Sequence, residues 1–292
     1  MIKQLILSVA ATLLAATGLQ GQFEQLARPA RGHVGAAVVL LETGAAVDFH
    51  GDEHFPMQSV YKLPIGMTVL RQVDDGALKL EQRVRVTADD MLPAMAHSPI
   101  RDQHPRGGVD FTVRELLRYM MVESDGTASD VLLRLAGGPD AVNVYLRGLG
   151  VQGVVVATTE KEMTRGDDVQ YRNWATPKEM LMLLRALQEG RGLSTSSRAL
   201  LLQFMTETTT GPRRLKGLLP AGTTVAHKTG TSNTVRGLTA ATNDVGLITL
   251  PDGRHLAIAV FVSDSPADQP TREAVIAKIA LAALEWGKAQ GH

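Results

Sequence analysis

The pattern of apolar and polar positions divides the chain into two strand-rich ends and a helical middle. Residues 34–41 (VGAAVVLL) form a continuous apolar run that is typical of a buried strand. A Glu-Thr-Gly turn separates this run from a second predicted strand over residues 45–49. After residue 206 the pattern returns to strands, and a helix rich in alanine and isoleucine over residues 270–287 closes the chain.

Apolar residues recur at helical spacing through the middle of the chain. The helices predicted from this pattern begin at residues 59, 112, 127, 139, 176 and 193. Thr112 and Glu115 form a capping box, and Thr176-Pro177 marks a second clear helix start. Pro64 is expected to kink the first helix just past its first turn. Residues 81–110 contain three prolines and a Gly-Gly pair, and are predicted to be mostly loop.

The strands near the C-terminus complete the predicted fold. They are expected over residues 223–228, 238–243, 245–250 and 255–262, with Pro251-Asp252-Gly253 as a hairpin turn between the last two. This order predicts two lobes, an α/β lobe with an antiparallel sheet flanked by helices and an inserted all-α lobe. The α/β lobe would take residues 22–58 and 207–292, and the helical lobe residues 59–206.

Composition and charge narrow the classes of function. Hydrophobic residues make up 44% of the 292 residues and charged residues 21%, as in ordinary globular proteins. The formal net charge is zero and no run of like charge occurs, so no nucleic-acid partner is predicted. The absence of cysteine excludes disulfides, thiolate metal ligands and a cysteine nucleophile.

The N-terminus indicates export. Met1-Ile2-Lys3 gives a positive start, and the apolar run over residues 5–19 is short for a membrane span and ends in small residues. This pattern predicts a signal peptide over residues 1–18, with cleavage after residue 21 as the alternative. The mature protein is therefore expected to be periplasmic or secreted, with no stable membrane association.

Residues 50–54 (HGDEH) suggest a metal site at first sight. Gly51 argues against a helix there, and no further group of ligands follows at a suitable spacing. A turn is predicted instead, and no metal or other cofactor is assigned.

The first candidate for catalysis is the stretch Gln58-Ser59-Val60-Tyr61-Lys62. Residues three apart on a helix lie on one face, so the Ser59 hydroxyl and the Lys62 amine can touch. An amine of lowered pKa can take the serine proton and create a nucleophile. A helix that begins at Ser59 would add the partial positive charge of its N-terminus. About one S-x-x-K match is expected by chance in a chain of this length, so the pair needs support.

Two further motifs supply that support. Ser124-Asp125-Gly126 lies between two predicted helices, and Lys228-Thr229-Gly230 ends a predicted strand. The motifs S-x-x-K, S-D-N and K-T-G in this order are the signature of class A β-lactamases and penicillin-binding proteins. The order and the predicted secondary structure agree here, although glycine stands at the third position of the middle motif.

Longer stretches make the resemblance more specific. The chain resembles class A serine β-lactamases over essentially all of its mature length, and among them the PER/VEB-type extended-spectrum branch. The stretches that carry this resemblance are residues 56–63 (PMQSVYKL), 170–174 (QYRNW), 207–212 (ETTTGP), 214–220 (RLKGLLP), 226–232 (AHKTGTS) and 240–244 (AATND). The resemblance implies the two-lobe fold of serine β-lactamases and transpeptidases, with an Ω-type loop around residues 158–175.

The motif chemistry assigns the first catalytic roles. Ser59 would attack a strained amide carbonyl and form an acyl-enzyme, while Lys62 and Ser124 would transfer protons. The resemblance implies that the backbone N–H groups of Ser59 and Thr231 form an oxyanion hole.

The resemblance also implies a glutamate that activates the deacylating water, in a pattern E-x-x-L-N. Residues 160–164 (EKEMT) are the best match. Glu160 is chosen because Met163 then replaces the leucine, and Glu162 is the alternative. Thr164 replaces the asparagine and is expected to hold the water differently. Whether the lysine or the glutamate acts as base in acylation stays open.

Polar groups near the third motif are predicted to bind the substrate. Lys228 and Thr229 would offer a positive charge and a hydroxyl to a substrate carboxylate. The predicted substrate-binding residues are Gly126, Arg214, Lys228, Thr229, Gly230, Thr231 and Ser232. Arg214 matches the branch's arginine, with Arg236 as the alternative. Gly126 replaces the family's asparagine, which contacts the substrate's side-chain carbonyl, so weaker binding of acylamino side chains is expected. His97 stands where the branch has an aromatic residue at the pocket rim.

The predicted function is hydrolysis of penicillins and cephalosporins by a monomer whose partner is a small-molecule β-lactam. Thr231-Ser232 resembles enzymes that accept bulky oxyimino cephalosporins, which are therefore candidate substrates. The alternatives are a penicillin-binding D,D-peptidase and an exported, non-hydrolysing β-lactam-binding sensor.

Overall fold

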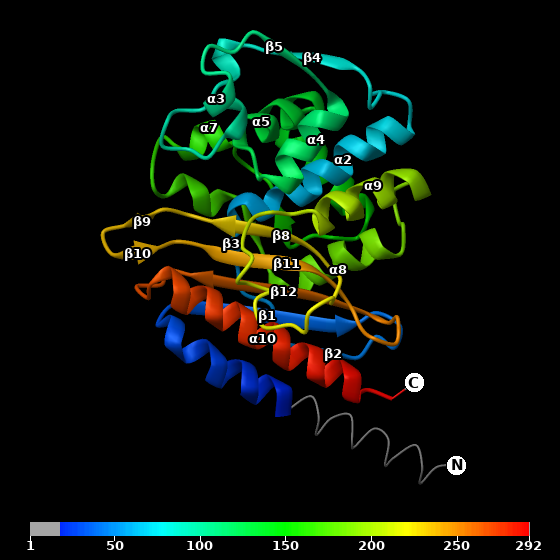
Figure 1. Ribbon diagram of the computed structural model, residues 1–292, viewed down its shortest axis with the longest axis vertical. Coiled ribbons are helices and arrows are strands. Elements are labelled where there is room, and N and C mark those ends of the chain that lie inside the picture. Colours follow the sequence, from blue (N-terminus) through cyan, green and yellow to red (C-terminus); the bar gives the residue numbers. More distant parts are fainter. Residues whose placement is uncertain (1–17, 292) are drawn as a thin grey trace.

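A five-stranded antiparallel sheet lies at the centre of the computed structural model, which describes residues 18–291 (Figure 1). Its strands stand in the order β2-β1-β12-β11-β8. They are β1 (His33–Leu40), β2 (Ala46–Phe49), β8 (Val225–Thr231), β11 (Thr242–Thr249) and β12 (His255–Ser263). Because β1 pairs with β12, the sheet joins the two ends of the chain. The predicted signal peptide falls almost entirely outside the described residues.

Both faces of this sheet are covered. All residues of β1 after His33 are buried, which explains its continuous apolar run. One face packs against α10 (Gln269–Ala289) and a helical segment over residues 18–27, with Phe23 and Ile276 fully buried between them. The other face packs against α8 (Pro177–Gln188) and the helices beyond it.

The helices of the middle part form the second lobe seen in Figure 1. They are α2 (Lys62–Asp74), α4 (Val113–Val122), α5 (Gly126–Leu135), α6 (Gly138–Gly148) and α9 (Thr195–Thr206). The predicted capping box at Thr112 is present, with Glu115 N donating to Thr112 Oγ1 at 3.1 Å and Thr112 N to Glu115 Oε2 at 2.7 Å. The predicted fold class is confirmed, while the residue boundaries between the lobes stay a prediction.

Short elements connect these layers. They are η1 (Arg28–Ala30), β3 (Phe55–Pro56), η2 (Gln58–Tyr61), β4 (Arg83–Val86), η3 (Ala88–Asp90), α3 (Pro99–Gln103), β5 (Val109–Thr112), β6 (Val154–Val155), α7 (Glu160–Met163), η4 (Val169–Arg172), β7 (Trp174–Ala175), β9 (Thr234–Val235) and β10 (Leu238–Thr239). Within residues 18–291, no helix combines the length and apolar character needed to cross a membrane.

Two predicted elements are wrong in detail. Ser59 does not open an α-helix but lies in the 3₁₀ turn η2, and α2 begins at Lys62. Pro64 is therefore the third residue of α2, where the backbone N–H has no acceptor within the helix, and the proline removes no helical hydrogen bond. The predicted strands over 238–243 and 245–250 are also divided differently, because β11 pairs without a break with β8 and β12 from Thr242 onward.

Candidate active site

The turn that carries Ser59 packs directly on β8. A Cβ at Gly230 would lie only 2.3 Å from the backbone oxygen of Met57, so a side chain there would push the turn away from the strand. Asn243 on β11 fixes the same turn, because its Nδ2 donates to the oxygens of Pro56 at 2.7 Å and Met57 at 3.1 Å. Gly230 and Asn243 thus bring the turn and the sheet together.

Ser59 Oγ lies beside an amine and a carboxylate. Lys62 Nζ donates to Ser59 Oγ at 3.0 Å, and Ser59 Oγ donates to Glu160 Oε1 at 3.5 Å. Lys62 and Glu160 form an ion pair of 2.8 Å, in which the Lys62 side chain is 1% exposed and that of Glu160 is 14% exposed. The predicted approach of Lys62 to Ser59 is present, although the two residues belong to different elements.

Ser124 connects Lys62 with a second buried amine. Its backbone is left-handed, with φ of 58°, in the turn between α4 and α5. Lys62 Nζ donates to the backbone oxygen of Ser124 at 2.6 Å, and Lys228 Nζ donates to Ser124 Oγ at 2.9 Å. Burial, and next the charge of Lys62, hold the pKa of Lys228 well below its usual range. The Ser124 hydroxyl therefore lies beside an amine that gives up its proton readily.

The two candidate glutamates have different contacts in the structure. Glu160 begins α7 and points to Lys62, whereas Glu162 closes a capping box, with its Oε2 accepting from Thr159 N at 3.0 Å and Thr158 Oγ1 at 2.9 Å. These hydrogen bonds, the Thr159 N–H first, lower the pKa of Glu162. Glu162 is thus committed to the fold of the loop.

Asp130 and Asn173 hold the loop of Glu160 in place, and neither role was predicted from the sequence. Asp130 on α5 accepts from Glu160 N at 2.8 Å and from Lys161 N at 2.9 Å. Asn173 Oδ1 accepts from Ala157 N at 2.7 Å and Thr158 N at 3.0 Å. The available signal for Asp130 was a carboxylate within the apolar run of a helix, where a charge needs a partner.

Asp130→Asn is expected to remove the fall in melting temperature that the Asp130 carboxyl causes as pH rises from about 4 to 7. Burial, and next the charge of Glu160, raise the pKa of Asp130 from 3.8 to about 7. A carboxyl with a raised pKa favours folding when protonated, so its contribution to stability falls as pH rises from about 4 to 7. Asparagine cannot ionise and removes this dependence. Thermal unfolding between pH 4 and 8 measures this dependence, with Asp140→Asn on the exposed start of α6 as control. A difference in melting temperature between Asp130→Asn and the unchanged protein that is the same at every pH would contradict the prediction.

A cavity of about 400 Å³ opens in front of Ser59. Its lining residues are Gln58, Ser59, Lys62, Met95, Ala96, His97, Glu160, Met163, Thr164, Arg165, Gly166, Asp167, Gln170, Thr231, Ser232, Asn233 and Val235. A larger hollow of about 540 Å³ lies between residues 18–26 and α10, and its lining contains no hydroxyl side chain. The Ser59 hydroxyl, the Lys62 amine and the Glu160 carboxylate all line the first of these two hollows.

Known proteins similar to this chain belong to one enzyme family. The model of the "Beta-lactamase enzyme family" matches residues 18–286. The chain is 44% identical to the extended-spectrum β-lactamase PER-1 of Pseudomonas aeruginosa over 268 residues, which cover 92% of this chain and 87% of that protein. A crystal structure described as a representative class A β-lactamase, from Bacteroides cellulosilyticus DSM 14838, is 32% identical with a TM-score of 0.89, covering 94% of this chain and 99% of that one.

The chain belongs to the class A β-lactamase family. A β-lactamase from Chitinophaga pinensis DSM 2588 is also similar in structure, with 46% identity, a TM-score of 0.89 and coverage of 94% of this chain and 100% of that one. The predicted family, its PER/VEB-like branch and the hydrolase activity are thereby confirmed.

Arg214 lies behind the β-lactamase cavity rather than in it. Its side chain is 3% exposed, and its guanidinium donates to the backbone oxygen of Gly230 at 3.1 Å and to Thr231 Oγ1 at 2.7 Å. Arg236, the alternative, lines a separate hollow of about 190 Å³ next to the cavity. Arg214 therefore reaches the cavity through Thr231.

The neighbours of position 126 explain why this β-lactamase has a glycine there. A Cβ there would lie 2.4 Å from Leu92 Cδ1 and 3.1 Å from the backbone oxygen of His97, so Leu92 fills the space that a side chain would need. Gly126 N donates to the same oxygen of His97 at 3.1 Å. His97 Nε2 donates to the Glu123 oxygen at 2.8 Å, which fixes the ring at the cavity rim.

Three other predicted residues differ in their exposure to the cavity. Thr229 is buried, and its hydroxyl lies 2.6 Å from that of Thr210. Ser232 lines the cavity, but its Oγ accepts from Ala241 N at 2.7 Å. Thr164 also lines the cavity, while its Oγ1 donates to the Lys161 oxygen at 2.8 Å. The Ser232 and Thr164 hydroxyls thus stabilise their own loops.

Proposed function

We propose that this β-lactamase works through an acyl-enzyme on Ser59. The observation that carries the proposal is the position of Ser59 Oγ, 3.0 Å from Lys62 Nζ and 3.5 Å from Glu160 Oε1 in one cavity. The serine proton passes to the Lys62–Glu160 pair as the Oγ–carbonyl bond forms. Backbone N–H groups of Ser59 and Thr231 stabilise the oxyanion, the charge that develops at this step.

Ser124 and Lys228 serve the departing ring nitrogen. When the carbon–nitrogen bond breaks, the nitrogen takes a proton from Ser124 Oγ. Ser124 Oγ then receives a proton from Lys62 Nζ, 3.5 Å away, or from Lys228 Nζ, 2.9 Å away. A substrate carboxylate near Lys228 stabilises the charged form of the buried Lys228 amine. Arg214 supports the same carboxylate through Thr231, and for this reason we propose Arg214 over Arg236.

Glu160 completes the cycle by activating water. A water between Glu160 and the ester carbonyl gives a proton to Glu160 and attacks the carbonyl carbon. As the ester bond breaks, Ser59 Oγ takes a proton back from the Lys62–Glu160 pair, which restores the free enzyme. The hydrogen bonds from Glu160 N and Lys161 N to Asp130 keep the carboxylate at the cavity wall. Glu162 has no part in this step.

We also propose that oxyimino cephalosporins are substrates. PER-1 is named an extended-spectrum β-lactamase, and this chain shares 44% of its residues over 268 positions. The cavity of about 400 Å³ has room for bulky side chains, because cavities of about 300–1,000 Å³ hold drug-sized ligands.

Purified protein should hydrolyse ceftazidime with a kcat/KM within about tenfold of that for a simple penicillin, since extra substituents change discrimination by modest factors. A chromogenic cephalosporin serves as the control for active protein. A preference of about 1,000-fold or more for the simple penicillin would refute the extended spectrum and leave the hydrolase activity intact.

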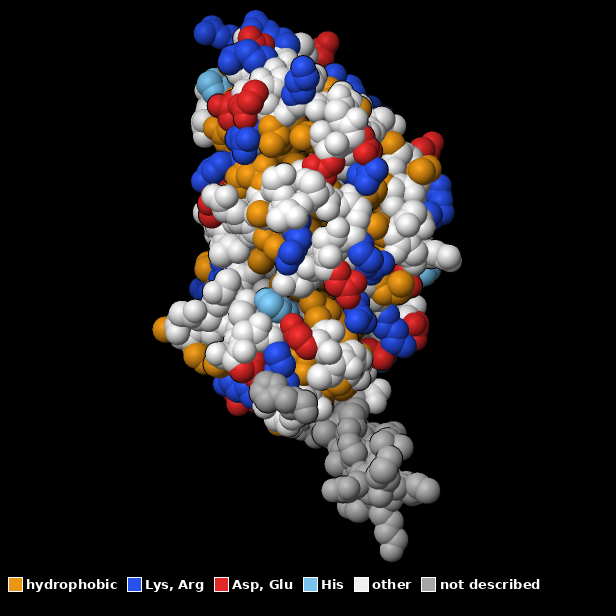
Figure 2. All heavy atoms as spheres, turned by 90° about the vertical axis from the view of Figure 1, so that its right-hand side faces the viewer, with side chains coloured by type: hydrophobic (Ala, Val, Ile, Leu, Met, Phe, Trp, Pro, Cys, Tyr) orange, Lys and Arg blue, Asp and Glu red, His pale blue; other side chains and the backbone are white. Residues whose placement is uncertain are grey.

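Export completes the proposal. We propose cleavage after Gly18, because Leu19 is 3% exposed and packs in the core on the α10 side of the sheet, so cleavage after Gly21 would remove a core residue. The mature enzyme would then act in the periplasm or outside the cell as a monomer, without membrane association or a nucleic-acid partner. Basic and acidic side chains are interspersed on the face shown in Figure 2, which fits a small-molecule substrate.

A further inference from the structure

We propose that His33, His50 and Glu53 bind one divalent transition-metal ion at the edge of the sheet, on a site separate from the catalytic cavity. His33 begins β1 and His50 directly follows β2. These strands are antiparallel, with Ala36 opposite Phe49, so the start of β1 lies beside the end of β2. The pairing of β1 with β2 thus brings the His33 imidazole to the turn at residues 50–54, from 17 positions earlier in the chain.

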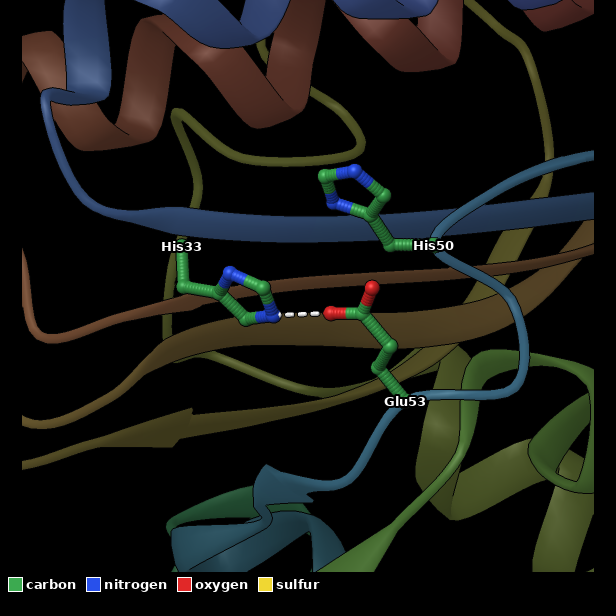
Figure 3. A group of neighbouring side chains, drawn as sticks. All are labelled: His33, His50 and Glu53. Atoms are coloured by element: carbon green, nitrogen blue, oxygen red, sulfur yellow. Dashed lines mark ion pairs between the residues drawn. The ribbon is translucent and has the colours of Figure 1, made fainter.

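Two of the three ligands already face each other. Figure 3 shows His33 Nε2 and Glu53 Oε2 in an ion pair, with the His50 ring to one side. One ligand atom from each residue lies within 4.8 Å of the other two. The ring of His33 is stacked between His50, with centroids 5.3 Å apart, and Phe55, at 4.8 Å. The His33 nitrogen and the Glu53 carboxylate oxygen thus point toward one another, as two ligands of one cation do.

The backbone under the site is well fixed. Glu53 N donates to the His50 oxygen at 3.2 Å, Gly51 N to Asp48 Oδ1 at 3.2 Å, and Lys178 N to the Gly51 oxygen at 3.1 Å. A fixed turn presents its side chains without further loss of backbone entropy on binding.

His50 must turn to complete the site. Its Nδ1 lies 2.9 Å from the backbone oxygen of Val34, and since a carbonyl only accepts, Nδ1 donates there and Nε2 is the nitrogen left to bind a metal. Two nitrogens bound to one zinc ion lie about 3.4 Å apart, so the three groups must also close in. All three residues are exposed, and exposed side chains change rotamer within nanoseconds.

The donor set selects the class of metal. Imidazole nitrogens favour Zn²⁺, Cu²⁺ and Ni²⁺ over Mg²⁺ and Ca²⁺, which prefer oxygen ligands throughout. Two histidines and one carboxylate leave at least one position of a tetrahedral ion to water. The ion would cross-link β1 to the turn that follows β2, and so stabilise the folded state against the unfolded one.

Calorimetric titration of the tag-free mature protein with ZnCl₂, after removal of metal by chelation, tests the proposal. We expect one Zn²⁺ per chain with a micromolar Kd, and a rise in melting temperature of about 5 °C at a hundredfold excess over Kd. His50→Asn and Glu53→Gln should each weaken binding at least about tenfold, as the loss of a metal ligand does. Asparagine tolerates the left-handed backbone at residue 50, where φ is 52°, so the fold should persist.

His255→Asn is the matched control. His255 Nδ1 also lies 2.9 Å from a glutamate, Glu42, but no third ligand is in reach of that pair among the described residues. This variant should keep the full affinity for zinc. No binding below about 1 mM, an undiminished affinity in His50→Asn, or an equal loss in His255→Asn would each overturn the proposal.

Discussion

Ser59→Ala is expected to lower kcat by about 10⁴-fold or more, because the loss of a serine nucleophile removes the covalent route altogether. Ser124 is another hydroxyl near Lys62, at 3.5 Å from its Nζ, but Ser124 Oγ already accepts from Lys228 at 2.9 Å, and we propose it as the proton donor rather than the nucleophile. The alanine removes one hydroxyl at the cavity wall, so substrate binding and the fold should persist. Hydrolysis of a chromogenic cephalosporin measures the loss.

Ser196→Ala gives the control for this result. Ser196 is exposed near the start of α9, far along the chain from the motifs, and its hydroxyl contacts only Ser194 Oγ among the hydrogen bonds of the described chain. This variant should turn over like the unchanged enzyme. If Ser59→Ala kept more than about 1% of kcat while its thermal unfolding matched the control, another group would be the nucleophile.

Elements whose signals lie close together in the sequence were predicted well. The box between Thr112 and Glu115 spans four residues and starts α4 where expected. Thr176 caps α8 by accepting from Glu179 N at 3.2 Å, again within four residues. The hairpin around Asp252 joins β11 to β12. Such local hydrogen bonds depend on nearby side chains alone, so the sequence contains all the information.

Features that depend on distant partners were not predictable in this way. The 3₁₀ turn of Ser59 rests on β8 and on Asn243, which lies 184 positions away in the sequence numbering. The support of Glu160 by Asp130 also joins residues far apart in the chain. The choice of Glu160 over Glu162 came from the family pattern, whereas the capping box of Thr159 and Glu162 is a local signal that also favours Glu160 and was not used.

Glu160→Gln is expected to trap the acyl-enzyme, with a fall in kcat of about 10³-fold, the scale of a general base. An amide cannot take a proton from water, so deacylation stops. Acylation can continue, because Lys62 Nζ remains 3.0 Å from Ser59 Oγ. Mass spectrometry of the protein after brief mixing with a simple penicillin should show one covalent adduct that adds the mass of the intact penicillin.

Glu162→Gln is the matched control for this trap, because it makes the same chemical change two residues away. Its amide oxygen can still accept from Thr159 N, now 3.0 Å from Glu162 Oε2, so the loop keeps its cap and should hold Glu160 in place. This variant should therefore turn over at nearly the unchanged rate and show no lasting adduct. The reverse outcome, an adduct with Glu162→Gln and normal turnover with Glu160→Gln, would assign the deacylating base to Glu162, and would require the loop to refold away from its capping box when substrate binds.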